Sequence, residues 1–423
     1  MSKKPKWRRR LSRTAWVNSV AITDNGRRVV AGTFIHQYKK NGKRVLSAAP
    51  NRRGTFGIFA YDSSGNQLWR DTYVGWDGVF AVGISGTGQI AAAGGWHDKK
   101  RGLLRIYDAA NGKIKFDFLD KELKRVSLLS LSQDGGVVAA AANKLYVFVR
   151  QGGSYVRLDH PDFSGAFQGK VTAVAVHPSG SWFVASDKKG NVLLATISDG
   201  KVKHTCQWSA PKAPINPKKP STDRVLVPFL SIQVARHAES FAVSGGDFVY
   251  LFTKSGICRK KPSRVYDTRN ERAPGQQTPK GNSRTHTAAE NVRWLAISDD
   301  GSFLTTVANR STGKAKTGLL LAYKRRSSAP VWKVALPHNP NGTSLDGEAK
   351  CVALADGYCT NPWVKPPDPP GKECDSAFYL FSANGEKLWE YPTSNMNWPI
   401  FISANGSAVA AGGDNGNLYY FKP

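Results

Sequence analysis

Long apolar runs are missing from this chain of 423 residues, and so are the short motifs of metal and nucleophile chemistry. No apolar run reaches the length of about 18 residues that a membrane-spanning helix needs. There is no CxxC, HxH or HExxH pattern and no GxSxG turn, so neither a zinc site nor a serine hydrolase site is indicated. We therefore expect no catalytic residue, no metal and no cofactor.

Cysteine is also scarce. The chain holds five, which are too few and too scattered for a disulfide framework: Cys206, Cys258, Cys351, Cys359 and Cys374. Cys359 and Cys374 flank a proline-rich loop, where they either form a bridge or remain two free thiols in a reducing compartment. The basic N-terminus is followed by no hydrophobic segment of a signal peptide, so a cytoplasmic protein is expected.

Acidic residues are outnumbered about two to one. The chain has 31 Asp and Glu residues and 60 Lys and Arg residues, which gives a formal net charge of +29. An excess of this size is typical of proteins that meet a polyanion, although lysine and arginine in loops can also serve solubility alone. The distribution of the charge over the fold therefore decides its meaning.

A repeated unit runs through the whole chain at a period of about 50 residues. Each copy has an apolar strand, a turn that usually contains glycine, a strand of small residues, an aromatic strand and often a polar strand with tryptophan. Two apolar runs around such a turn indicate a hairpin. The hairpins lie at 19–33, 81–95, 128–142, 173–187, 230–245, 294–308, 343–356 and 400–413.

Four strands per unit predict an all-β fold, a single closed β-propeller that spans residues 1–423. The last unit ends after its third strand, and Trp7 aligns with Trp389, so an N-terminal strand is expected to complete the last blade and remove open sheet edges. We expect eight blades, or seven if the fifth or seventh unit is an insertion. The units are approximately 15–75, 76–120, 121–165, 166–225, 226–288, 289–338, 339–394, and 395–423 with 6–14.

The units resemble those of the WD40 and quinoprotein-like β-propeller superfamilies. The stretch "RIYDAANGKIKF", with Asp108, Gly112 and Phe116, is similar to the Ala-x-Asp-x-x-Thr-Gly-x-x-x-Trp docking motif of eight-bladed quinoprotein folds, and "FAYDSSGNQLW", with Gly65 and Trp69, is one residue shorter. The resemblance implies the fold and says nothing about activity. Quinoprotein dehydrogenases carry a vicinal disulfide, and this chain has no adjacent cysteines.

The repeat also predicts where the charge gathers. In a propeller, the connections from the second to the third strand and from the fourth strand to the next blade emerge on one face, and the long basic loops all fall in this set. We expect these residues to form an anion-binding or nucleic-acid-binding surface: Lys39, Lys40, Lys43, Arg44, Arg52, Arg53, Lys99, Lys100, Arg101, Lys188, Lys189, Lys218, Lys219, Arg259, Lys260, Lys261, Arg310 and Lys314.

Aromatic side chains near basic loops can stack on exposed bases. The candidates are Tyr38, Trp96, Trp208 and Trp363, although for Trp96 and Trp208 we favour packing within their own blades. The leading hypothesis is a non-enzymatic, monomeric scaffold that binds RNA or single-stranded DNA within a larger assembly. The alternatives are an adaptor for an acidic protein or peptide, and an enzyme on the quinoprotein-like scaffold.

Overall fold

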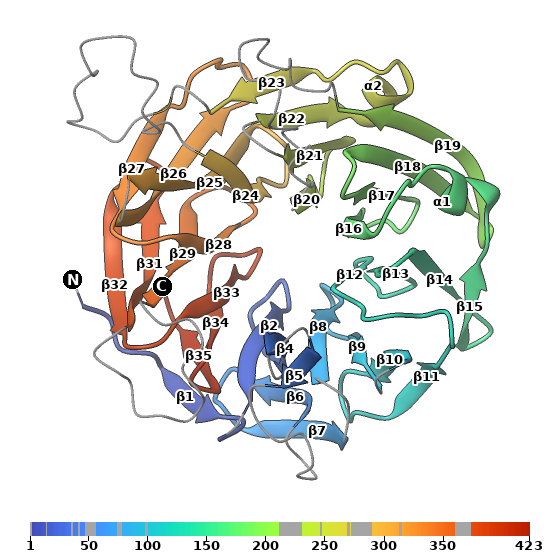
Figure 1. Ribbon diagram of the computed structural model, residues 1–423, viewed down its shortest axis with the longest axis horizontal. Helices are drawn as coiled ribbons and strands as arrows, with labels where there is room; N and C mark the ends of the chain where they lie inside the picture. Colours follow the sequence, from blue (N-terminus) through green and yellow to red (C-terminus); the bar gives the residue numbers. More distant parts are fainter. Residues whose placement is uncertain are drawn as a thin grey trace.

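The computed structural model is a closed ring of antiparallel sheets, a β-propeller of about eight four-stranded blades (Figure 1). It describes residues 2–13, 15–34, 37–40, 43–46, 56–73, 78–97, 100–210, 231–245, 248–268, 271, 290–312, 315–359 and 374–423. Of these, the backbone alone is described for residues 37–40, 43–46, 73, 290–293, 309–312, 315–317, 358–359 and 374. No helix among the described residues is long and apolar enough to cross a membrane.

The blades follow one another around the ring in chain order. Blade one contains β2 (Trp16–Ile22), β3 (Arg28–Phe34), β6 (Phe56–Asp62) and β7 (Gln67–Tyr73), and blade two contains β8 (Gly78–Ile84), β9 (Ile90–Trp96), β10 (Gly102–Asp108) and β11 (Ile114–Phe118). Blade three contains β12 (Leu128–Leu131), β13 (Val137–Ala141), β14 (Leu145–Gln151) and β15 (Ser154–Leu158). Blade four contains β16 (Val171–Val176), β17 (Trp182–Asp187), β18 (Asn191–Ser198) and β19 (Lys201–Ser209).

The fifth and seventh units, whose irregular sequence left seven blades open as an alternative, each form a sheet: the fifth has four strands, and the seventh has five because the short strand β30 pairs with β31. Blade five contains β20 (Ser231–Val234), β21 (Ser240–Gly245), β22 (Phe248–Thr253) and β23 (Arg264–Asp267). Blade six contains β24 (Glu290–Ile297), β25 (Phe303–Thr312), β26 (Ala315–Lys324) and β27 (Trp332–Leu336). Blade seven contains β28 (Pro340–Leu345), β29 (Cys351–Asp356), β31 (Cys374–Ser382) and β32 (Lys387–Thr393).

The last blade, called here the closing blade, joins both ends of the chain. It contains β33 (Asn397–Ile402), β34 (Val409–Gly413), β35 (Asn417–Phe421) and, as its outer strand, β1 (Trp7–Arg10). Trp7 pairs with Tyr420 and stacks on its ring at a centroid distance of 5.0 Å. The predicted N-terminal closure is confirmed, and it removes the unpaired edge that β35 would otherwise present.

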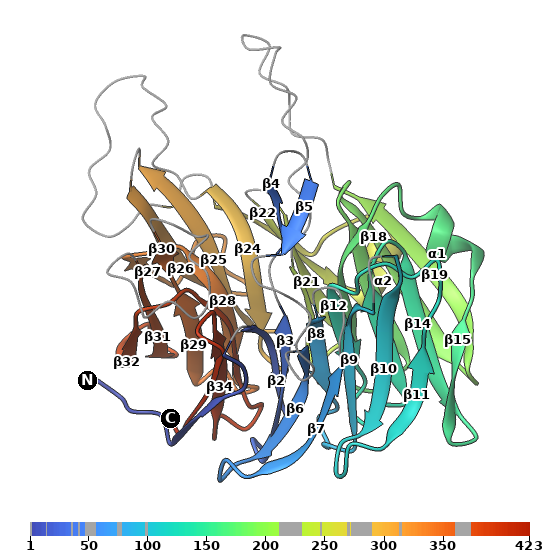
Figure 2. The ribbon, with the colours of Figure 1, turned by 60° about the horizontal axis from the view of Figure 1, so that its bottom comes forward.

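Short additional elements sit between the blade strands. The hairpin of β4 (Gln37–Lys40) and β5 (Lys43–Leu46) lies between β3 and β6 and projects from the disc (Figure 2), and β30 (Tyr358–Cys359) pairs with β31. The helices are α1 (Pro161–Gly165), before blade four, and α2 (Lys254–Cys258), between β22 and β23. The pairing of β30 places Cys359 opposite Cys374, and their side chains are outside the described part of the structure.

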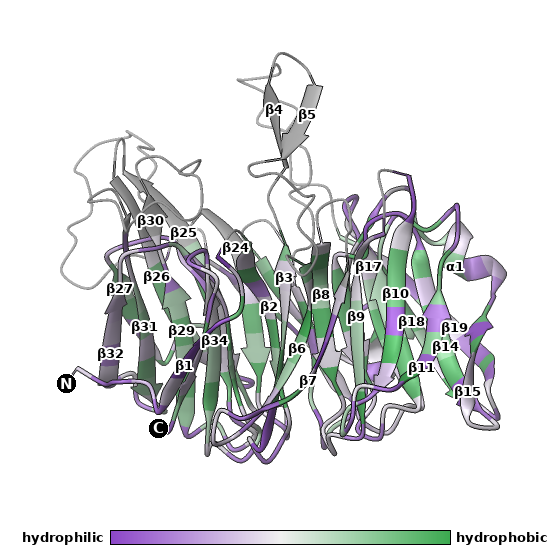
Figure 3. Ribbon diagram, turned by 90° about the horizontal axis from the view of Figure 1, so that it is seen from below, coloured by the Kyte–Doolittle hydropathy of each residue, from purple (hydrophilic) through white to green (hydrophobic). Residues whose placement is uncertain are grey.

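The apolar strands form the core because both faces of the middle strands of a blade are covered by neighbouring blades. In β13 all five residues are buried, and the small side chains Ala139, Ala140 and Ala141 let the adjacent blades approach closely. Hydrophobic residues dominate the strands through the height of the disc, while polar residues concentrate toward its connections (Figure 3). The core is therefore a ring of inter-blade layers.

Recurrent tryptophans lock neighbouring blades together. The Trp69 ring of blade one donates its Nε1 hydrogen to the Ala109 carbonyl of blade two at 2.9 Å, and a Cβ on Gly112 would come within 2.8 Å of this ring. Gly112 has φ +75°, which L side chains rarely adopt, so both the turn and the ring contact require glycine. The Trp7 ring packs on Gly65 and the Trp332 ring on Gly385 in the same way, and each indole N–H donates to a carbonyl of the next blade.

Blades four and five are also linked by a disulfide. Cys206 of β19 and Cys258 of α2 are bonded, with their Cα atoms 4.9 Å apart. The spacing of the five cysteines did not indicate this pair, because the two residues are 52 positions apart and only the packing of α2 against β19 brings them together.

Candidate functional site

The two faces of the disc differ in their connections. The insertion face is defined by the β4–β5 hairpin and the ends of β25 and β26, which project on the same side (Figure 2). The β17–β18 turn, which contains Lys188, is the same kind of connection and belongs to this face. The turn face is defined by the hairpin turns between the first two strands of each blade, such as 23–28, and by the connections from the third to the fourth strand, such as α2.

Four of the predicted cations with described side chains belong to connections of the insertion face, and many others lie outside the described part of the structure. Lys188 and Lys189 form the β17–β18 turn and are exposed, and Lys100 and Arg101 lie before β10. For Lys39, Lys40, Lys43, Arg44, Arg310 and Tyr38 the backbone alone is described. The residues outside the described ranges are Arg52, Arg53, Lys99, Lys218, Lys219, Lys314 and Trp363.

Arg259, Lys260 and Lys261 are on the wrong face for the predicted surface. The prediction placed them in a loop between two blades, but α2 and β23 fall within this segment, so the three residues connect the third strand of blade five to its fourth. The start of α2 contacts the turn face directly, since Lys254 Nζ lies 2.7 Å from Glu239 Oε1 in the adjacent turn.

Trp208 is not available for stacking on a base. Its side chain is 7% exposed and packs edge-on against Tyr250 and Phe252 of blade five, at centroid distances of 4.8 and 5.0 Å. It belongs to the core between blades four and five. Trp96 is half-buried at the end of β9.

A cluster at the insertion-face mouth of the central channel combines the predicted Lys188 and Lys189 with residues that the sequence did not single out. Lys170 directly precedes β16, Arg125 precedes β12, and Phe80 lies near the start of β8, so all three are at the beginning of the innermost strands of three successive blades. The guanidinium of Arg125 lies over the Phe80 ring, 4.3 Å from its centroid. We call Phe80, Arg125, Lys170, Lys188 and Lys189 the mouth cluster.

Two cations of the mouth cluster are close enough to affect each other. Burial and the nearby charge of Arg125 lower the pKa of Lys170 below its ordinary value. The backbone N–H of Lys188 donates to the Lys170 carbonyl at 3.1 Å, and the aliphatic stem of Lys188 lies against Gly169. The mouth cluster therefore concentrates positive charge at a partly desolvated place, where an anion would be favoured.

Asp187 holds this turn in place. The carboxylate is fully buried and accepts hydrogen bonds from the backbone N–H groups of Lys189, Asn191 and Gln168 at 2.8, 2.9 and 2.9 Å. The last bond ties the β17–β18 turn to the loop before β16. Nearby acids have other partners: Glu122 pairs with Lys144, and Asp120 with Arg157.

Aromatic rings continue the mouth cluster toward blade one. Phe34 contacts Phe80 edge-on at a centroid distance of 5.1 Å, and Trp16 contacts Phe34 at 5.6 Å. Trp16 and Phe34 are buried, whereas Phe80 is half-buried. The rings give the cations an apolar wall on one side.

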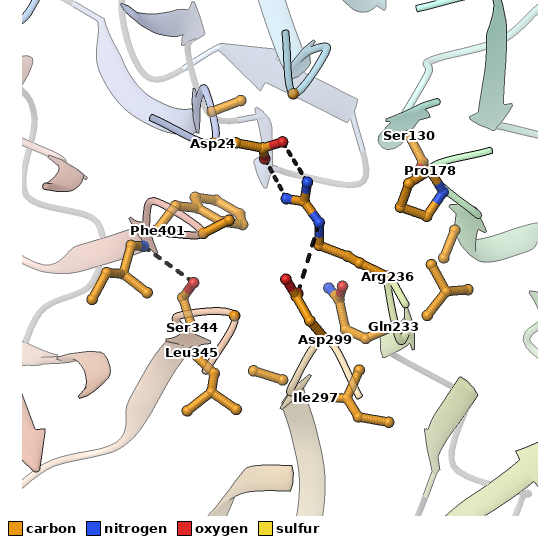
Figure 4. Close-up of a pocket in the computed structure, with 18 of the residues that line it drawn as sticks. Asp24, Ser130, Pro178, Gln233, Arg236, Ile297, Asp299, Ser344, Leu345 and Phe401 are labelled. Carbon is orange, nitrogen blue, oxygen red and sulfur yellow. Dashed lines mark hydrogen bonds and ion pairs between the residues drawn. The ribbon is translucent and has the colours of Figure 1, made fainter. Parts of the chain in front are cut away.

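The opposite end of the channel is crossed by an ion network (Figure 4). Both terminal nitrogens of Arg236 donate to the Asp24 carboxylate, Nη2 also donates to Gln133 Oε1 at 2.8 Å, and Nε lies 3.7 Å from Asp299 Oδ1. Burial raises the pKa of Asp299, although the charge of Arg236 opposes this. A cavity of about 280 Å³ beside this network is lined by residues of the innermost strands, including Leu131, Val176 and Phe401.

Backbone hydrogen bonds join the turns around this end of the channel. Asp24 N–H donates to the Gly86 carbonyl at 3.2 Å, and Gln133 N–H donates to that of Pro178 at 2.8 Å. Pro178 has no N–H, so it cannot donate the corresponding hydrogen bond to the next turn, which precedes β21 and contains Arg236. In the remaining turns, the N–H of His237 donates to the Asp299 carbonyl (2.7 Å) and that of Asp299 to the Gly347 carbonyl (2.9 Å). The N–H of Gly347 donates to the Ala404 carbonyl (2.8 Å) and that of Asn405 to the Asp24 carbonyl (3.1 Å).

Comparisons with known proteins agree with this architecture. Residues 161–204, which span α1 and the strands of blade four, match the family model described as "WD domain, G-beta repeat". A search of curated protein sequences finds no match. The class of protein that the blade topology defines is the β-propeller, and the matched segment is one WD40-like unit within it.

Solved structures resemble the chain in fold at low sequence identity. Sqt1 of Chaetomium thermophilum, crystallised with the N-terminus of ribosomal protein L10, has a TM-score of 0.63 at 13% identity, with 100% of both chains covered. A crystal structure of Chaetomium thermophilum Sqt1 has a TM-score of 0.64 at 12% identity, covering 100% of this chain and 98% of the other. The WD40 repeats of RRP9 have 0.51 at 8%, covering 79% and 86%.

Proposed function

We propose that this protein is a non-enzymatic docking scaffold whose insertion face binds single-stranded nucleic acid, RNA or DNA, as part of a larger assembly. The observation that supports this most is the mouth cluster, in which the half-buried Lys170 lies near Arg125. Holding two cations together at a partly desolvated position costs free energy, and a phosphate bound between them would offset that cost.

The neighbouring features suit a phosphate-rich chain better than an isolated anion. Lys188 and Lys189 add exposed positive charge beside Lys170, and Lys100 and Arg101 lie in another connection of the same face. Half-buried Phe80 offers an apolar neighbour for a base, and contacts of this kind tolerate any sequence. Binding of this type is expected to be strongly salt-dependent and weakly sequence-selective.

A fluorescence-anisotropy titration of a labelled 20-nucleotide oligouridine against the full chain tests the proposal. Replacing Lys188 and Lys189 by glutamate should weaken binding at least tenfold at low salt and lower the slope of log affinity against log salt by about 2, because two phosphate contacts are lost. The matched control is Lys260→Glu with Lys261→Glu, an equal charge change on the turn face, which should leave the affinity unchanged.

A different class of partner would give a different result. The Sqt1 structure shows that a propeller of this fold is found with a protein N-terminus, so an acidic protein or peptide is the second candidate. It would be supported if a polyglutamate peptide bound in a Lys188- and Lys189-dependent way while the oligouridine showed no affinity even at low salt. That outcome would overturn the nucleic-acid proposal and retain the scaffold.

A further inference from the structure

We propose that His204, Cys206 and Cys258 form a binding site for a thiophilic divalent cation, with Zn²⁺ as the best match, when the disulfide between blades four and five is reduced. Within the described residues this is the group of three histidine, cysteine or acidic side chains whose ligand atoms lie within 4.8 Å of one another. The site is on the outer side of the disc and is independent of what the insertion face binds.

Strand periodicity and one short helix bring the three side chains together. His204 and Cys206 are two residues apart in β19, so they project from the same side of the strand, as Trp208 does toward blade five. Cys258 is the last residue of α2, whose first turn is capped by the Thr253 hydroxyl accepting from Gly256 N–H at 3.0 Å. Ile257 is fully buried and anchors α2.

The distances already approach those of a tetrahedral site. His204 Nε2 lies 3.1 Å from Cys206 Sγ and 3.8 Å from Cys258 Sγ. Zinc bonds of about 2.3 Å to sulfur and 2.0–2.1 Å to nitrogen place tetrahedral ligands roughly 3.6 Å (S to N) and 3.8 Å (S to S) apart. Once the sulfur–sulfur bond is broken, the two sulfurs need to separate by roughly 2 Å in total, a shift that side-chain rotation and α2 can absorb.

The chemistry of the ligands selects the cation. Two thiolates and an imidazole are soft to borderline donors, which favour zinc over magnesium or calcium. Cys206 is buried, whereas His204 and Cys258 are exposed, so solvent can reach the site and water can supply a fourth ligand. A site with three protein ligands exchanges its metal more readily than a closed four-ligand site.

The same sulfurs make metal binding exclusive with the disulfide. Two molecules of a small thiol such as glutathione reduce the Cys206–Cys258 bond, giving two protein thiols and one glutathione disulfide. Zn²⁺ then binds as the two thiols release two protons. The link between the blades is consequently a covalent bond in the oxidised chain and a metal bridge in the reduced chain.

Titration of the reduced full-length protein with Co²⁺, a spectroscopic substitute for Zn²⁺, tests the site. We expect a thiolate-to-cobalt charge-transfer band and the intense visible bands of tetrahedral cobalt at one equivalent, both displaced by Zn²⁺. Cys206→Ser and Cys258→Ser should abolish the bands, and His204→Ala should weaken binding at least tenfold. The oxidised protein should show none of them.

Other cysteines provide the matched control. The Cys351→Ser/Cys359→Ser/Cys374→Ser variant keeps the three ligands and should retain the full signal, and bound Zn²⁺ should slow re-formation of the disulfide by oxidised glutathione. Absence of the cobalt bands in the reduced protein, or bands that persist in Cys206→Ser, would overturn the site. Circular dichroism of each variant separates loss of a ligand from loss of the fold.

Discussion

Asp356 illustrates what burial does to a single charged residue. It is fully buried at the end of β29, and its carboxyl accepts from Ala377 N–H at 2.7 Å and from the Tyr379 hydroxyl at 3.1 Å. Burial raises its pKa to about 6, against the smaller opposing effect of these bonds and of His338. The folded protein therefore retains this proton at a pH where the unfolded chain has lost it.

Stability should thus fall with rising pH through the Asp356 transition. Below pH 4 the Asp356 carboxyl is protonated in both states, and between pH 4 and 6 it ionises in the unfolded chain alone. Above pH 6 the resulting loss in the free energy of unfolding is constant at about 3 kcal/mol. Asp356→Asn removes the ionisation, so its urea-unfolding free energy should lack this fall. The exposed control Asp199→Asn should keep the fall, since it leaves Asp356 unchanged. The Ser198 hydroxyl and Lys203 lower the pKa of Asp199, so its own ionisation acts with the opposite sign.

Arg236 is the second residue whose environment predicts a measurable effect. Replacing it by alanine leaves Asp24 and the partly buried Asp299 without their cation, so we expect a loss of about 3 kcal/mol in urea unfolding. Arg236→Ala with Asp24→Asn should recover part of the loss, because one uncompensated carboxylate is removed. Equal stability of Arg236→Ala and the wild type would contradict the role assigned to this network.

At the scale of the strand and turn, the docking tryptophans make a matched comparison. Trp69 Nε1 donates to Ala109, which lies in the turn of the next blade, whereas Trp389 Nε1 is buried without a partner among the described residues. The reason is the chain closure, since the closing blade has no turn between its third strand, β35, and its fourth, β1. The same residue type thus has two different environments.

Phenylalanine substitution separates these environments. Trp69→Phe loses a buried hydrogen bond and should cost about 1 kcal/mol beyond the loss of ring area. Trp389→Phe removes a polar group that has no partner and should cost less, since the desolvation of that group is relieved. Thermal and urea unfolding of the two variants measure the difference, and a larger cost for Trp389→Phe would contradict the explanation.

Short strands and helices show the limit of what the sequence could predict. The hairpins and the aromatic third strands were predictable because the apolar and glycine pattern repeats in each blade. The fourth strand of blade five is only Arg264–Asp267, and one helical turn precedes it, so the basic stretch from Arg259 read as loop. Short strands with little apolar content carry too weak a pattern to assign a neighbouring residue to a face.

In the mouth cluster, Lys188 and Lys189 were predicted and the other three residues were not. Phe80, Arg125 and Lys170 follow one another at intervals of 45 residues and belong to three different repeat units. They meet because the starts of successive innermost strands converge on the channel mouth. The repeat could indicate the face, but only the packing of one blade against the next shows which cations on that face come together.

At the scale of the whole molecule, β1 is expected to control both closure and association. A chain lacking residues 1–10 should expose the edge of β35 and lose the stacking of Trp7 on Tyr420. We predict a lower melting temperature and self-association by light scattering, because an unpaired edge strand recruits other strands. The control Arg8→Ala keeps the strand and replaces only an exposed side chain, so it should stay closed and monodisperse.

The closing blade has a further consequence for how the protein can be handled and joined to other molecules. Its third strand, β35, runs toward the turn face, and β1 starts from that same face, so both ends of the described chain emerge on the side away from the mouth cluster. A tether attached at either end, to a sensor surface or to a fused domain, would orient every molecule alike, with the insertion face outward and its cations open to solution.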